Sequence, residues 1–459
     1  MHAHYDAIVI GTGQAGPSLA VRLAGAGRTV AIVERKRFGG TCVNNGCMPT
    51  KALVASAYAA HVASRAAEYG VVIEGPVRVD MKQVKARKDA IVQRAAANIE
   101  KWLSGTERVT VVRGHARFES PTSVRVGDDV LEAKQIFVNV GGRAAVPGIP
   151  GLAEVDYLTN STIMDVDVVP EHLVVLGGSY IGLEIAQVFR RFGAKVTVVE
   201  KADRLIARED ADVSAGVADI LRNEGIAIET GAECMALEKR GARIALKLDC
   251  KGKGYEVAGS HLFLALGRVP NTGDLGLDQA GVAVDERGFI TVNDELRTNV
   301  AGIWALGDCN GRGAFTHTAY NDYEVVADNL LLGEKRTIAK RLPAYALFTD
   351  PPLGRVGMTD GEVRRSGRKA LVGMRPMTRV GRAVEKGETQ GFMKITVDAE
   401  SKAILGAAIL GVGGDEAIHA VLDTMTADAP YTTLKHAVHI HPTVAELLPT
   451  LLGELQPLD

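Results

Sequence analysis

Two cysteines, Cys42 and Cys47, lie in the segment GGTCVNNGCMPTK at residues 39–51. Four residues separate them, and Pro49 suits an early position in a helix. On a helix start this spacing places the two thiols close enough to form a disulfide. The N-terminus of a helix also lowers the pKa of a thiol and keeps the sulfur a nucleophilic thiolate. The segment therefore predicts a redox-active cysteine pair.

A metal site is the alternative interpretation of these cysteines. It needs two further Cys or His ligands at short spacing, whereas Cys234, Cys250 and Cys309 are scattered singly along the chain. We therefore expect no metal site, and we expect these three cysteines to be small buried residues. In a reducing cytosol a close cysteine pair is more often catalytic than structural.

A glycine-rich turn follows the first predicted strand, at residues 5–10. Gly11 makes the turn, Gly13 lets the backbone approach a pyrophosphate, and Gly16 lets the following helix pack on the strand. Glu34 ends the next strand, where a carboxylate accepts hydrogen bonds from a ribose diol. Strand, turn, helix, strand and terminal acid together predict a bound dinucleotide.

The same pattern recurs at residues 172–200, HLVVLGGSYIGLEIAQVFRRFGAKVTVVE. Its turn contains Gly177, Ser179 and Gly182, and Glu200 ends the second strand. Ser179 stands where the middle glycine is usual, and even a small side chain crowds the approach of a pyrophosphate. The repeat predicts that one chain binds two dinucleotides.

Other segments predict the elements around these turns. Residues 81–103 have the pattern of a long helix, and short strands are expected over 109–140. After residue 336 the pattern changes to mixed strands and helices, with FMKITVD and AILGAAILGV as strands. A chain of 459 residues is too long for one hydrophobic core, so several domains joined by short connections are expected.

The bulk composition narrows the classes of function. Lys and Arg total 53 and Asp and Glu total 55, so the net charge of −2 gives no reason to expect nucleic acid or an anionic membrane as partner. No run of eighteen apolar residues and no basic-then-apolar leader is present. We therefore expect a soluble, cytoplasmic protein. The 51 glycines suit α/β layers with many tight turns.

The order of the motifs resembles that of the class I pyridine nucleotide–disulfide oxidoreductases. After the first glycine turn, the cysteine segment and the second turn come ALGRVPNT (265–272), GIWALGDCNG (302–311) and HIHPTVAE (439–446). The resemblance covers essentially the whole chain. The family includes dihydrolipoamide dehydrogenase, glutathione reductase and mercuric reductase, and its members act in cell redox homeostasis.

The resemblance implies an α/β fold. It has two Rossmann-like FAD- and NAD(P)-binding domains, the first interrupted by the second, and a C-terminal α+β dimerisation domain. The implied boundaries are 1–150 and 271–335 for the FAD-binding domain, 151–270 for the NAD(P)-binding domain and 336–459 for the dimerisation domain.

The resemblance also implies an electron path and a role for each catalytic residue. Electrons pass from NAD(P)H through FAD to the Cys42–Cys47 disulfide and on to an acceptor. Cys47 would face the flavin as the charge-transfer thiolate, and Cys42 would be the interchange thiol that attacks substrate. Lys51 and Glu184 would form an ion pair beside the flavin.

Two sets of cofactor-binding residues follow from the resemblance. The FAD set is Gly11, Gly13, Gly16, Glu34, Gly40, Thr41, Lys51, Gly114, Ala116, Gly142 and Asp308. The NAD(P) set is Gly177, Gly178, Ser179, Gly182, Glu200, Gly267 and Arg268. Glu200 predicts NADH over NADPH, because a carboxylate accepts from the ribose hydroxyls and repels a 2′-phosphate. Lys201 and Arg204 follow closely and soften that preference, so NADPH is a second candidate.

His441, followed by Glu446, matches the HPT-x-x-E arrangement of the family's thiol–disulfide reductases. A histidine oriented by a carboxylate acts as a general acid or base. The nearby His436 and His439 are interpreted as surface histidines. The resemblance further implies a homodimer in which this histidine reaches the redox site of the other subunit.

The acceptor is left open by the sequence. A small disulfide is the leading hypothesis, because His441 and Glu446 serve thiol protonation. Mercuric reductase is the main rival, although such enzymes typically carry a C-terminal cysteine pair and no cysteine follows Cys309. A dihydrolipoamide dehydrogenase subunit of a multienzyme complex is a third hypothesis, and the two cysteines disfavour a transhydrogenase. Residues 315–323, FTHTAYNDY, and Pro352 differ from the residues that are commoner in the family at these positions, which indicates an unusual substrate.

Overall fold

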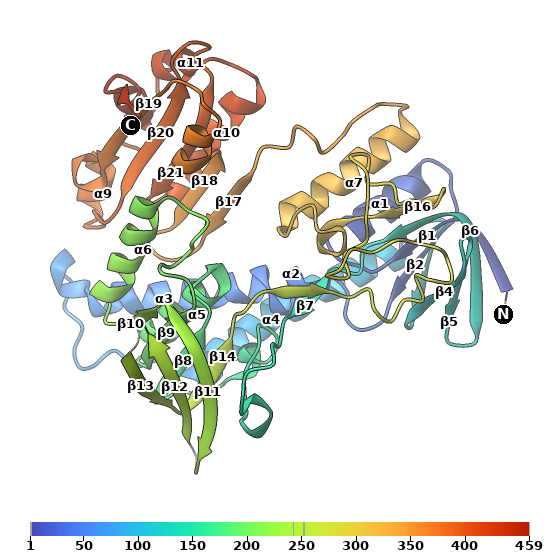
Figure 1. Ribbon diagram of the computed structural model, residues 1–459, viewed down its shortest axis with the longest axis horizontal. Helices are drawn as coiled ribbons and strands as arrows, with labels where there is room; N and C mark the ends of the chain where they lie inside the picture. Colours follow the sequence, from blue (N-terminus) through green and yellow to red (C-terminus); the bar gives the residue numbers. More distant parts are fainter. Residues whose placement is uncertain (1, 242, 251–252, 459) are drawn as a thin grey trace.

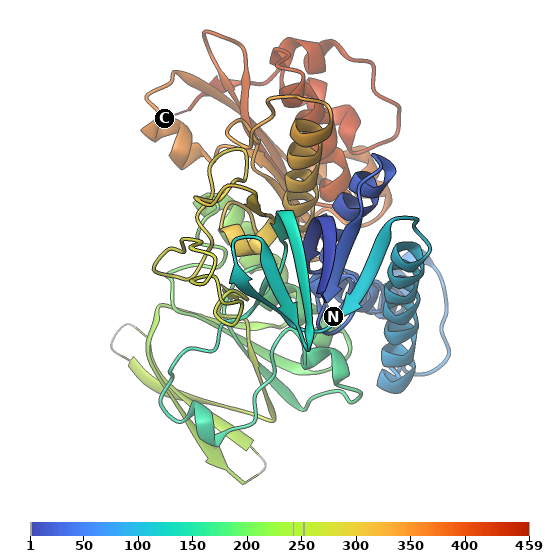
Figure 2. The ribbon, with the colours of Figure 1, turned by 90° about the vertical axis from the view of Figure 1, so that its right-hand side faces the viewer.

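The strands of the molecule gather in three regions (Figure 1). The computed structural model describes residues 2–241, 243–250 and 253–458. One region holds the N-terminal sheet, the second holds a smaller parallel sheet and an antiparallel sheet, and the third holds the C-terminal sheet. Figure 1 shows the C-terminal region and the second region on the same side of the N-terminal sheet, and Figure 2 shows the C-terminal region above and the second region below.

The N-terminal sheet has seven strands in the order β3-β2-β1-β6-β5-β4, with β16 paired to β6. The pairs that β1 makes with β2 and β6 are parallel, and its last four residues are all buried, as in a sheet covered on both faces. Because β16 also pairs in parallel with β6, the chain beyond residue 271 contributes a strand to this sheet. The strands are β1 (His2–Ile10), β2 (Val30–Glu34), β3 (Val109–Arg113), β4 (Ala116–Ser120), β5 (Ser123–Val126), β6 (Asp129–Val138) and β16 (Ile303–Ala305).

Long helices flank this sheet, and α4 shows why one begins where it does. The carboxylate of Asp80 accepts hydrogen bonds from the backbone N–H groups of Lys82 (3.0 Å) and Gln83 (3.1 Å), which have no partner inside the helix. The helix predicted over 81–103 is confirmed with one further residue. The helices are α1 (Ala15–Gly25), α3 (Cys47–Ser64), α4 (Met81–Ser104) and α7 (Thr316–Leu331).

The second region repeats the strand–turn–helix–strand pattern of the first. Its parallel sheet has the order β10-β9-β8-β14, and the antiparallel strands, in the order β11-β12-β13, lie in the chain between β10 and β14. The parallel strands are β8 (His172–Leu176), β9 (Lys195–Glu200), β10 (Ala227–Thr230) and β14 (His261–Leu264), with α5 (Tyr180–Arg191) and α6 (Ala211–Asn223). The antiparallel strands are β11 (Ala232–Arg240), β12 (Arg243–Cys250) and β13 (Lys253–Gly259). A two-stranded connection, β7 (Gly142–Ala144) with β15 (Arg268–Pro270), links this region to the first.

The C-terminal region is an antiparallel sheet in the order β17-β18-β21-β20-β19-β22. The predicted strand FMKITVD has the same bounds as β20. The predicted strand at 403–412 is observed as the shorter β21. Every residue of both strands is buried, because helices pack against them. The strands are β17 (Ala344–Leu347), β18 (Leu353–Gly357), β19 (Ala370–Pro376), β20 (Phe392–Asp398), β21 (Ile404–Leu410) and β22 (Gln456–Pro457). The helices are α8 (Asp360–Arg365), α9 (Gly381–Glu385), α10 (Gly414–Thr426), α11 (Tyr431–His436) and α12 (Leu448–Leu451).

Candidate active site

The two cysteines stand on two helices. Cys42 lies in α2 (Gly40–Asn45), whereas Cys47 is the first residue of α3, so the expectation of a single helix start is wrong. Gly46 interrupts the helix with φ −135° and ψ −117°. A Cβ atom at Gly46 would lie 2.9 Å from the carbonyl oxygen of Thr41, so the tight junction requires glycine. The junction brings the two thiols close enough that each shifts the pKa of the other.

Both thiols are free, and their acidities differ. The hydrogen bond from Cys42 is the main cause that lowers the pKa of Cys47 to about 6, helped by Thr316 and the positive charge of Lys51 against the effect of burial. The same hydrogen bond, together with burial, raises the pKa of Cys42 well above its usual range. At neutral pH the pair therefore holds a thiolate on Cys47 and a neutral thiol on Cys42.

Lys51, one turn further along α3, forms an ion pair with Glu184 of α5. Its Nζ lies 2.6 Å from Glu184 Oε2 and 4.3 Å from the centroid of the Phe348 ring. The other carboxylate oxygen, Glu184 Oε1, accepts a hydrogen bond from the backbone N–H of Phe348 at 3.0 Å. The ion pair thus joins α3 of the first region to α5 of the second, with the Glu184 carboxylate buried.

The first glycine turn can receive a group that no side chain fills. Gly11 has φ +105°, and a Cβ atom there would lie 2.3 Å from the Asn139 carbonyl oxygen; one at Gly16 would lie 2.2 Å from Gly11 O. Asn139 Nδ2, beside Gly13 and Gly16, is buried and has no hydrogen-bond partner among the described residues. A buried donor facing a bare backbone turn fits the phosphate of a dinucleotide such as FAD.

The acid at the end of β2 closes this turn. Glu34 Oε2 accepts hydrogen bonds from the backbone N–H (3.1 Å) and the hydroxyl (2.5 Å) of Thr12. A Cβ atom at Gly40 would lie 2.9 Å from Gly13 Cα, so the start of α2 packs directly on the turn. The backbone N–H of Gly114 donates to Glu34 O at 3.0 Å. The first turn, Glu34, Gly40 and Gly114 are thus gathered in one place.

Arg268 lies among residues assigned to FAD from the sequence. Its Nε is 3.4 Å from Asp308 Oδ2, and its guanidinium donates to Thr41 Oγ1 (3.3 Å) and to Gly142 O. Burial raises the pKa of Asp308 against the opposing charge of Arg268. Ala116 is buried in β4, which leaves its backbone as the part that can contact a ligand.

The second glycine turn has the same construction. Gly177 has φ +111°, and a Cβ atom at Gly182 would lie 2.0 Å from Gly177 O. Glu200 Oε2 accepts a hydrogen bond from the backbone N–H of Gly178 at 2.6 Å. Ser179 is exposed in an extended conformation with φ −115°, so no left-handed backbone requires glycine there. Gly267, with φ +99°, follows β14 at the end of the same sheet.

His441 and Glu446 form a hydrogen-bonded pair away from the cysteines. His441 Nδ1 lies 2.9 Å from Glu446 Oε2, and the His441 side chain is 80% exposed. Val438 and Ile440 in the same segment are also exposed, at 100% and 79%. Within the described residues of one chain, no contact joins His441 to Cys42. The exposed ring and its apolar neighbours are thus available to another molecule.

The remaining cysteines give one result. Cys309 is fully buried, as expected, and burial raises its pKa to about 12. The side chains of Cys234 and Cys250 lie outside what the structure describes, so their predicted burial stays a prediction. Among the described residues, no group of three or more His, Cys, Asp or Glu is arranged to hold a metal ion.

Thr316 is a contact of the redox pair that the sequence analysis missed. Its Oγ1 lies 3.1 Å from Cys47 Sγ, although the two residues are 269 positions apart. The only signal in the sequence was that residues 315–323 differ from those usual in the family, and it did not indicate what Thr316 contacts. Asn139 was also missed, because a single asparagine after a strand has no distinctive pattern.

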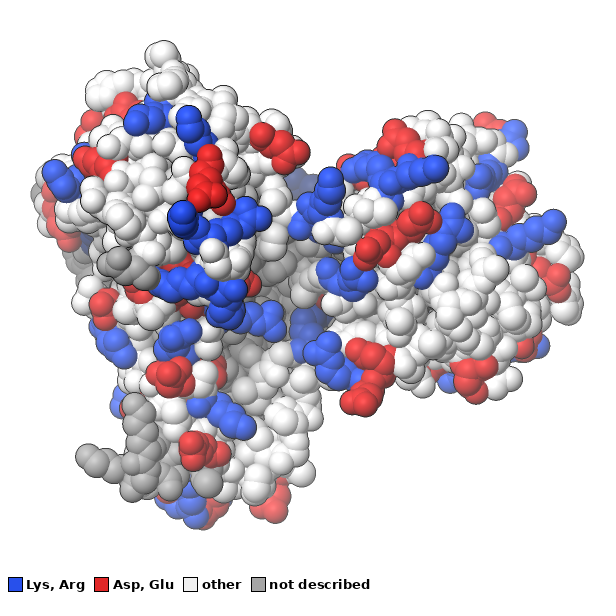
Figure 3. Space-filling view, turned by 45° about the horizontal axis from the view of Figure 1, so that its top comes forward, with Lys and Arg blue, Asp and Glu red and all other residues white. Residues whose placement is uncertain are grey.

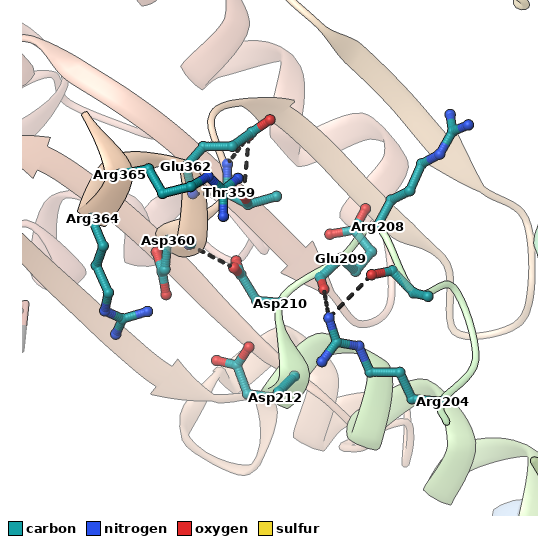
Figure 4. Close-up of a pocket in the computed structure, with 13 residues that line it drawn as sticks. Arg204, Arg208, Glu209, Asp210, Asp212, Thr359, Asp360, Glu362, Arg364 and Arg365 are labelled. Atoms are coloured by element: carbon teal, nitrogen blue, oxygen red, sulfur yellow. Dashed lines mark hydrogen bonds between the residues drawn. The ribbon is translucent and has the colours of Figure 1, made fainter. Parts of the chain in front are cut away.

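A cavity of about 700 Å³ lies at the seam between the second and third regions (Figure 4). Arg204 and Arg208 of the second region and Arg364 and Arg365 of α8 are among the residues that line it. Neither redox cysteine lines it. Figure 3 shows Lys and Arg mixed with Asp and Glu over the visible face, in keeping with the near-neutral net charge.

Comparison with known proteins places this geometry in a family. A family model described as pyridine nucleotide-disulphide oxidoreductase matches residues 5–322, and the model of the dimerisation domain of the same family matches residues 343–452. The chain belongs to the class I pyridine nucleotide–disulfide oxidoreductases. It is therefore a flavoprotein oxidoreductase of an FAD-dependent family that uses pyridine nucleotides.

Relatives with several names match the chain over nearly its full length. It is 35% identical over 457 residues to the probable pyridine nucleotide-disulfide oxidoreductase RclA of Escherichia coli, covering 98% of this chain and 99% of the relative. It is 34% identical to a mercuric reductase of Streptomyces lividans (97% and 95% covered) and 32% identical to a dihydrolipoyl dehydrogenase of Thermus scotoductus (96% and 95%). These names support disulfide oxidoreductase chemistry in general and leave the substrate undecided.

Solved structures support the mixed α/β fold. The HOCl-induced flavoprotein disulfide reductase RclA from Escherichia coli superposes with a TM-score of 0.88 at 34% identity, covering 98% of this chain and 99% of that chain. A Cu(II) complex of the same reductase superposes with a TM-score of 0.89. In the part of the chain that the structure describes, no helix has the length and apolar character needed to cross a membrane.

Proposed function

We propose that this protein is a cytoplasmic, homodimeric flavoenzyme that uses NADH to reduce a small disulfide through Cys42 and Cys47. The observation that carries the proposal is the unequal pair of thiols, with the pKa of Cys47 lowered to about 6 and that of Cys42 raised. A thiolate on one cysteine and a protonated thiol on the other is the arrangement expected of a reduced dithiol ready for exchange. FAD, when bound, supplies the two-electron relay between NADH and the disulfide.

The chain's own residues carry out the exchange. The Cys42–Cys47 disulfide takes up two electrons and one proton, giving the Cys42 thiol and the Cys47 thiolate. Cys42 loses its proton to a base and attacks one sulfur of the substrate disulfide, forming a mixed disulfide and releasing the first thiolate, which is protonated. Cys47 then attacks Cys42 Sγ, re-forming the internal disulfide and releasing the second substrate thiolate, which also takes a proton.

The raised pKa of Cys42 means that the exchange needs a base. We assign this role to His441 of the partner subunit, oriented by the carboxylate of Glu446 in the same chain. The support is the hydrogen bond at 2.9 Å, the exposed ring, and the apolar side chains of Val438 and Ile440 that stand in solvent beside it. A two-fold dimer would make two such shared sites, since an isologous interface repeats every contact.

Glu200 supports NADH as the donor. Its carboxylate stands at the second glycine turn and accepts from the backbone of Gly178 and Ala202, which holds a negative charge where a 2′-phosphate would lie. Steady-state kinetics with both dinucleotides tests this assignment. We expect a higher kcat/KM for NADH, and a higher value for NADPH would contradict the role of Glu200.

The decisive experiment compares electron acceptors with wild type and Cys42→Ser. Purified FAD-loaded enzyme with NADH is assayed against low-molecular-weight disulfides, lipoamide, Hg(II), Cu(II) and a quinone. We expect a disulfide to be the best acceptor, and we expect Cys42→Ser to abolish its reduction while NADH still reduces the flavin. Disulfide reduction by Cys42→Ser at the wild-type rate would overturn the proposal.

Reduction of a metal ion is the second candidate, favoured by the relatives. One relative is named mercuric reductase, and a structure of another is titled a Cu(II) complex. Here the metal ion would be the substrate and would take electrons from the reduced enzyme. If Hg(II) or Cu(II) supports much faster NADH oxidation than every disulfide, this candidate replaces the first. A preference for lipoamide would instead favour a dihydrolipoyl dehydrogenase role in a multienzyme complex.

A further inference from the structure

The start of α7 meets the redox pair through one side chain. Thr316 is the first residue of α7, and its Oγ1 lies 3.1 Å from Cys47 Sγ. Thr316 also lowers the pKa of Cys42, so its hydroxyl acts on both thiols, and Cys47 is the one that it contacts at 3.1 Å. A hydroxyl has one proton to donate, and a thiolate can only accept. When Cys47 is a thiolate, the hydrogen bond must therefore run from Thr316 to the sulfur.

The position of Thr316 is fixed by its neighbours. The ring of Phe315 stacks on Tyr345 with centroids 5.5 Å apart and meets Tyr180 edge-on at 6.1 Å. Thr318 closes the helix start, since its hydroxyl donates to Phe315 O at 2.7 Å and accepts from Phe315 N at 3.2 Å. The tyrosines come from α5 and β17, so three parts of the fold hold the Thr316 hydroxyl in place.

The charged groups around Cys47 have opposing effects on its thiolate, so a neutral hydrogen-bond donor can shift the balance. Cys42 faces the sulfur from α2, Lys51 faces it from α3, and Glu184 faces it from α5. Lys51 stabilises the thiolate, but its ion pair with Glu184 places a negative charge nearby that opposes it. Thr316 adds a neutral donor from a fourth element. Because Thr316 is the first residue of α7, the positive end of that helix dipole also lies near Cys47.

We propose that Thr316 is a positioning residue that holds the negative charge of the reduced pair on Cys47 and so keeps Cys42 as the thiol that meets the substrate. The proposal rests on the proposed function, because it assigns a task within the same dithiol. Residues 315–323 differ from the residues that are usual in the family at these positions. The contact between Thr316 and Cys47 would make this difference matter for the charge on Cys47.

The test measures the acidity of Cys47 in the reduced holoenzyme. Iodoacetamide alkylation of Cys47 is followed against pH by peptide mass spectrometry in wild type, Thr316→Val and Thr316→Ser. Val keeps the shape of Thr without the hydroxyl, whereas Ser keeps the hydroxyl. A hydrogen bond to a charged group is worth enough to change the thiolate population several-fold. We expect alkylation of Cys47 at pH 6 to slow by about fivefold or more in Thr316→Val and to stay near wild type in Thr316→Ser.

Thr318→Val is the matched control, because its hydroxyl bonds the backbone of Phe315 and not the sulfur. An unchanged alkylation profile in Thr316→Val, or an equal shift in Thr318→Val, would overturn the proposal. The long-wavelength charge-transfer absorbance is recorded on the same samples. Its absence in wild type would contradict the proposed flavin–Cys47 relay, whereas a shifted alkylation profile in Thr316→Val would still support the role of Thr316.

Discussion

At the residue scale, two chemically identical thiols differ because of where each one lies. Cys47 begins a helix and accepts hydrogen bonds, whereas Cys42 is the donor and is half-buried. The resulting division between a thiolate and a thiol separates the two tasks of electron transfer and substrate attack. Neither cysteine alone would have both properties at neutral pH.

The pH dependence of alkylation checks this division. In the reduced enzyme we expect Cys47 to react with a midpoint of about pH 6 and Cys42 to react with a clearly higher midpoint. Since the pKa of Cys47 is lower in the folded state than in the unfolded chain, its contribution to stability is present above the unfolded pKa and is lost as pH falls through about 6. Peptide mass spectrometry separates the two sites. Equal midpoints for the two cysteines would contradict the assignment.

The histidine pair gives a second prediction at this scale. General acid–base catalysis supplies roughly 10²–10⁴-fold in rate. We expect His441→Ala to lower disulfide turnover by about that factor while flavin reduction by NADH stays nearly unchanged, and Glu446→Ala to do less, because Glu446 orients the ring. His439→Ala is the control, since His439 Nδ1 contacts the backbone oxygen of Ala437 and no carboxylate among the described residues. Stopped-flow and steady-state rates measured together separate the two half-reactions.

At the element scale, both glycine turns owe their shape to backbone contacts. In each of them a strand ends, the chain reverses at a glycine with positive φ, and a second glycine packs the helix against the first. An acid from the next strand then accepts backbone N–H groups of the turn. The result is a ready-made surface of N–H groups and bare backbone for a pyrophosphate.

Gly11→Ala should break the first turn. The new Cβ would lie 2.3 Å from Asn139 O at a residue with φ +105°, so we expect reduced FAD content and a lower melting temperature. Gly25→Ala is the matched control in the same unit. Gly25 ends α1 with nothing within 4 Å of a new Cβ, so the variant should retain FAD and wild-type stability. The absorbance ratio of flavin to protein and thermal unfolding decide the comparison; full FAD content in Gly11→Ala would refute it.

At the scale of the whole molecule, a buried ion cluster fastens the second region to the third. Lys394 of β20 lies 2.8 Å from Asp360, 3.1 Å from Asp210 and 2.8 Å from Asp212, the last two at the start of α6. Burial opposes the charge on Lys394, but hydrogen bonds to Asp212 and Asp360 outweigh it, and the pKa of Lys394 is raised. Arg355, also buried, lies 3.2 Å from Asp210. The cavity of Figure 4 opens beside this cluster.

Removing the central cation should cost stability. Lys394→Met leaves Asp210 and Asp360 largely buried without their main partner, and such a loss typically destabilises by about 3–5 kcal/mol. We expect a clearly lower melting temperature. Lys369→Met is the control, since the Lys369 side chain is 81% exposed and pairs with the exposed Glu400. A Lys394→Met protein that melts with the control would show that the cluster contributes little.

The shared site of the proposed dimer is tested by mixing variants. We expect the Cys42→Ser and His441→Ala homodimers each to be inactive or slow in disulfide reduction. After subunit exchange, one active site of the mixed dimer contains both substitutions and the other contains neither, so disulfide reduction should be partly restored. Exchange is verified with differently tagged chains. No recovery despite proven exchange, or a fully active monomer, would falsify the shared-site arrangement.

The sequence by itself determined the redox pair, both dinucleotide turns and the family. These features are local: a strand, a glycine turn and a helix are specified by residues close together in the chain, and the motifs of the family follow in a fixed order. The long helix over 81–103 and the strand FMKITVD were predicted for the same reason, because hydrophobic periodicity and helix capping are short-range properties.

Only the tertiary structure decided what distant residues do to these local features. The sequence placed both cysteines on one helix start, but the contact between Gly46 and Thr41 divides the segment into two helices. It gave no indication that Thr316 would touch Cys47, or that Arg268 would reach Asp308. Hydrogen bonds, burial and ion pairing across the fold set the acidity of a thiol, and they depend on which residues the folded chain brings together. Spacing along the chain could therefore identify the reacting groups, whereas the contacts that shift the pKa values of the two thiols depend on packing.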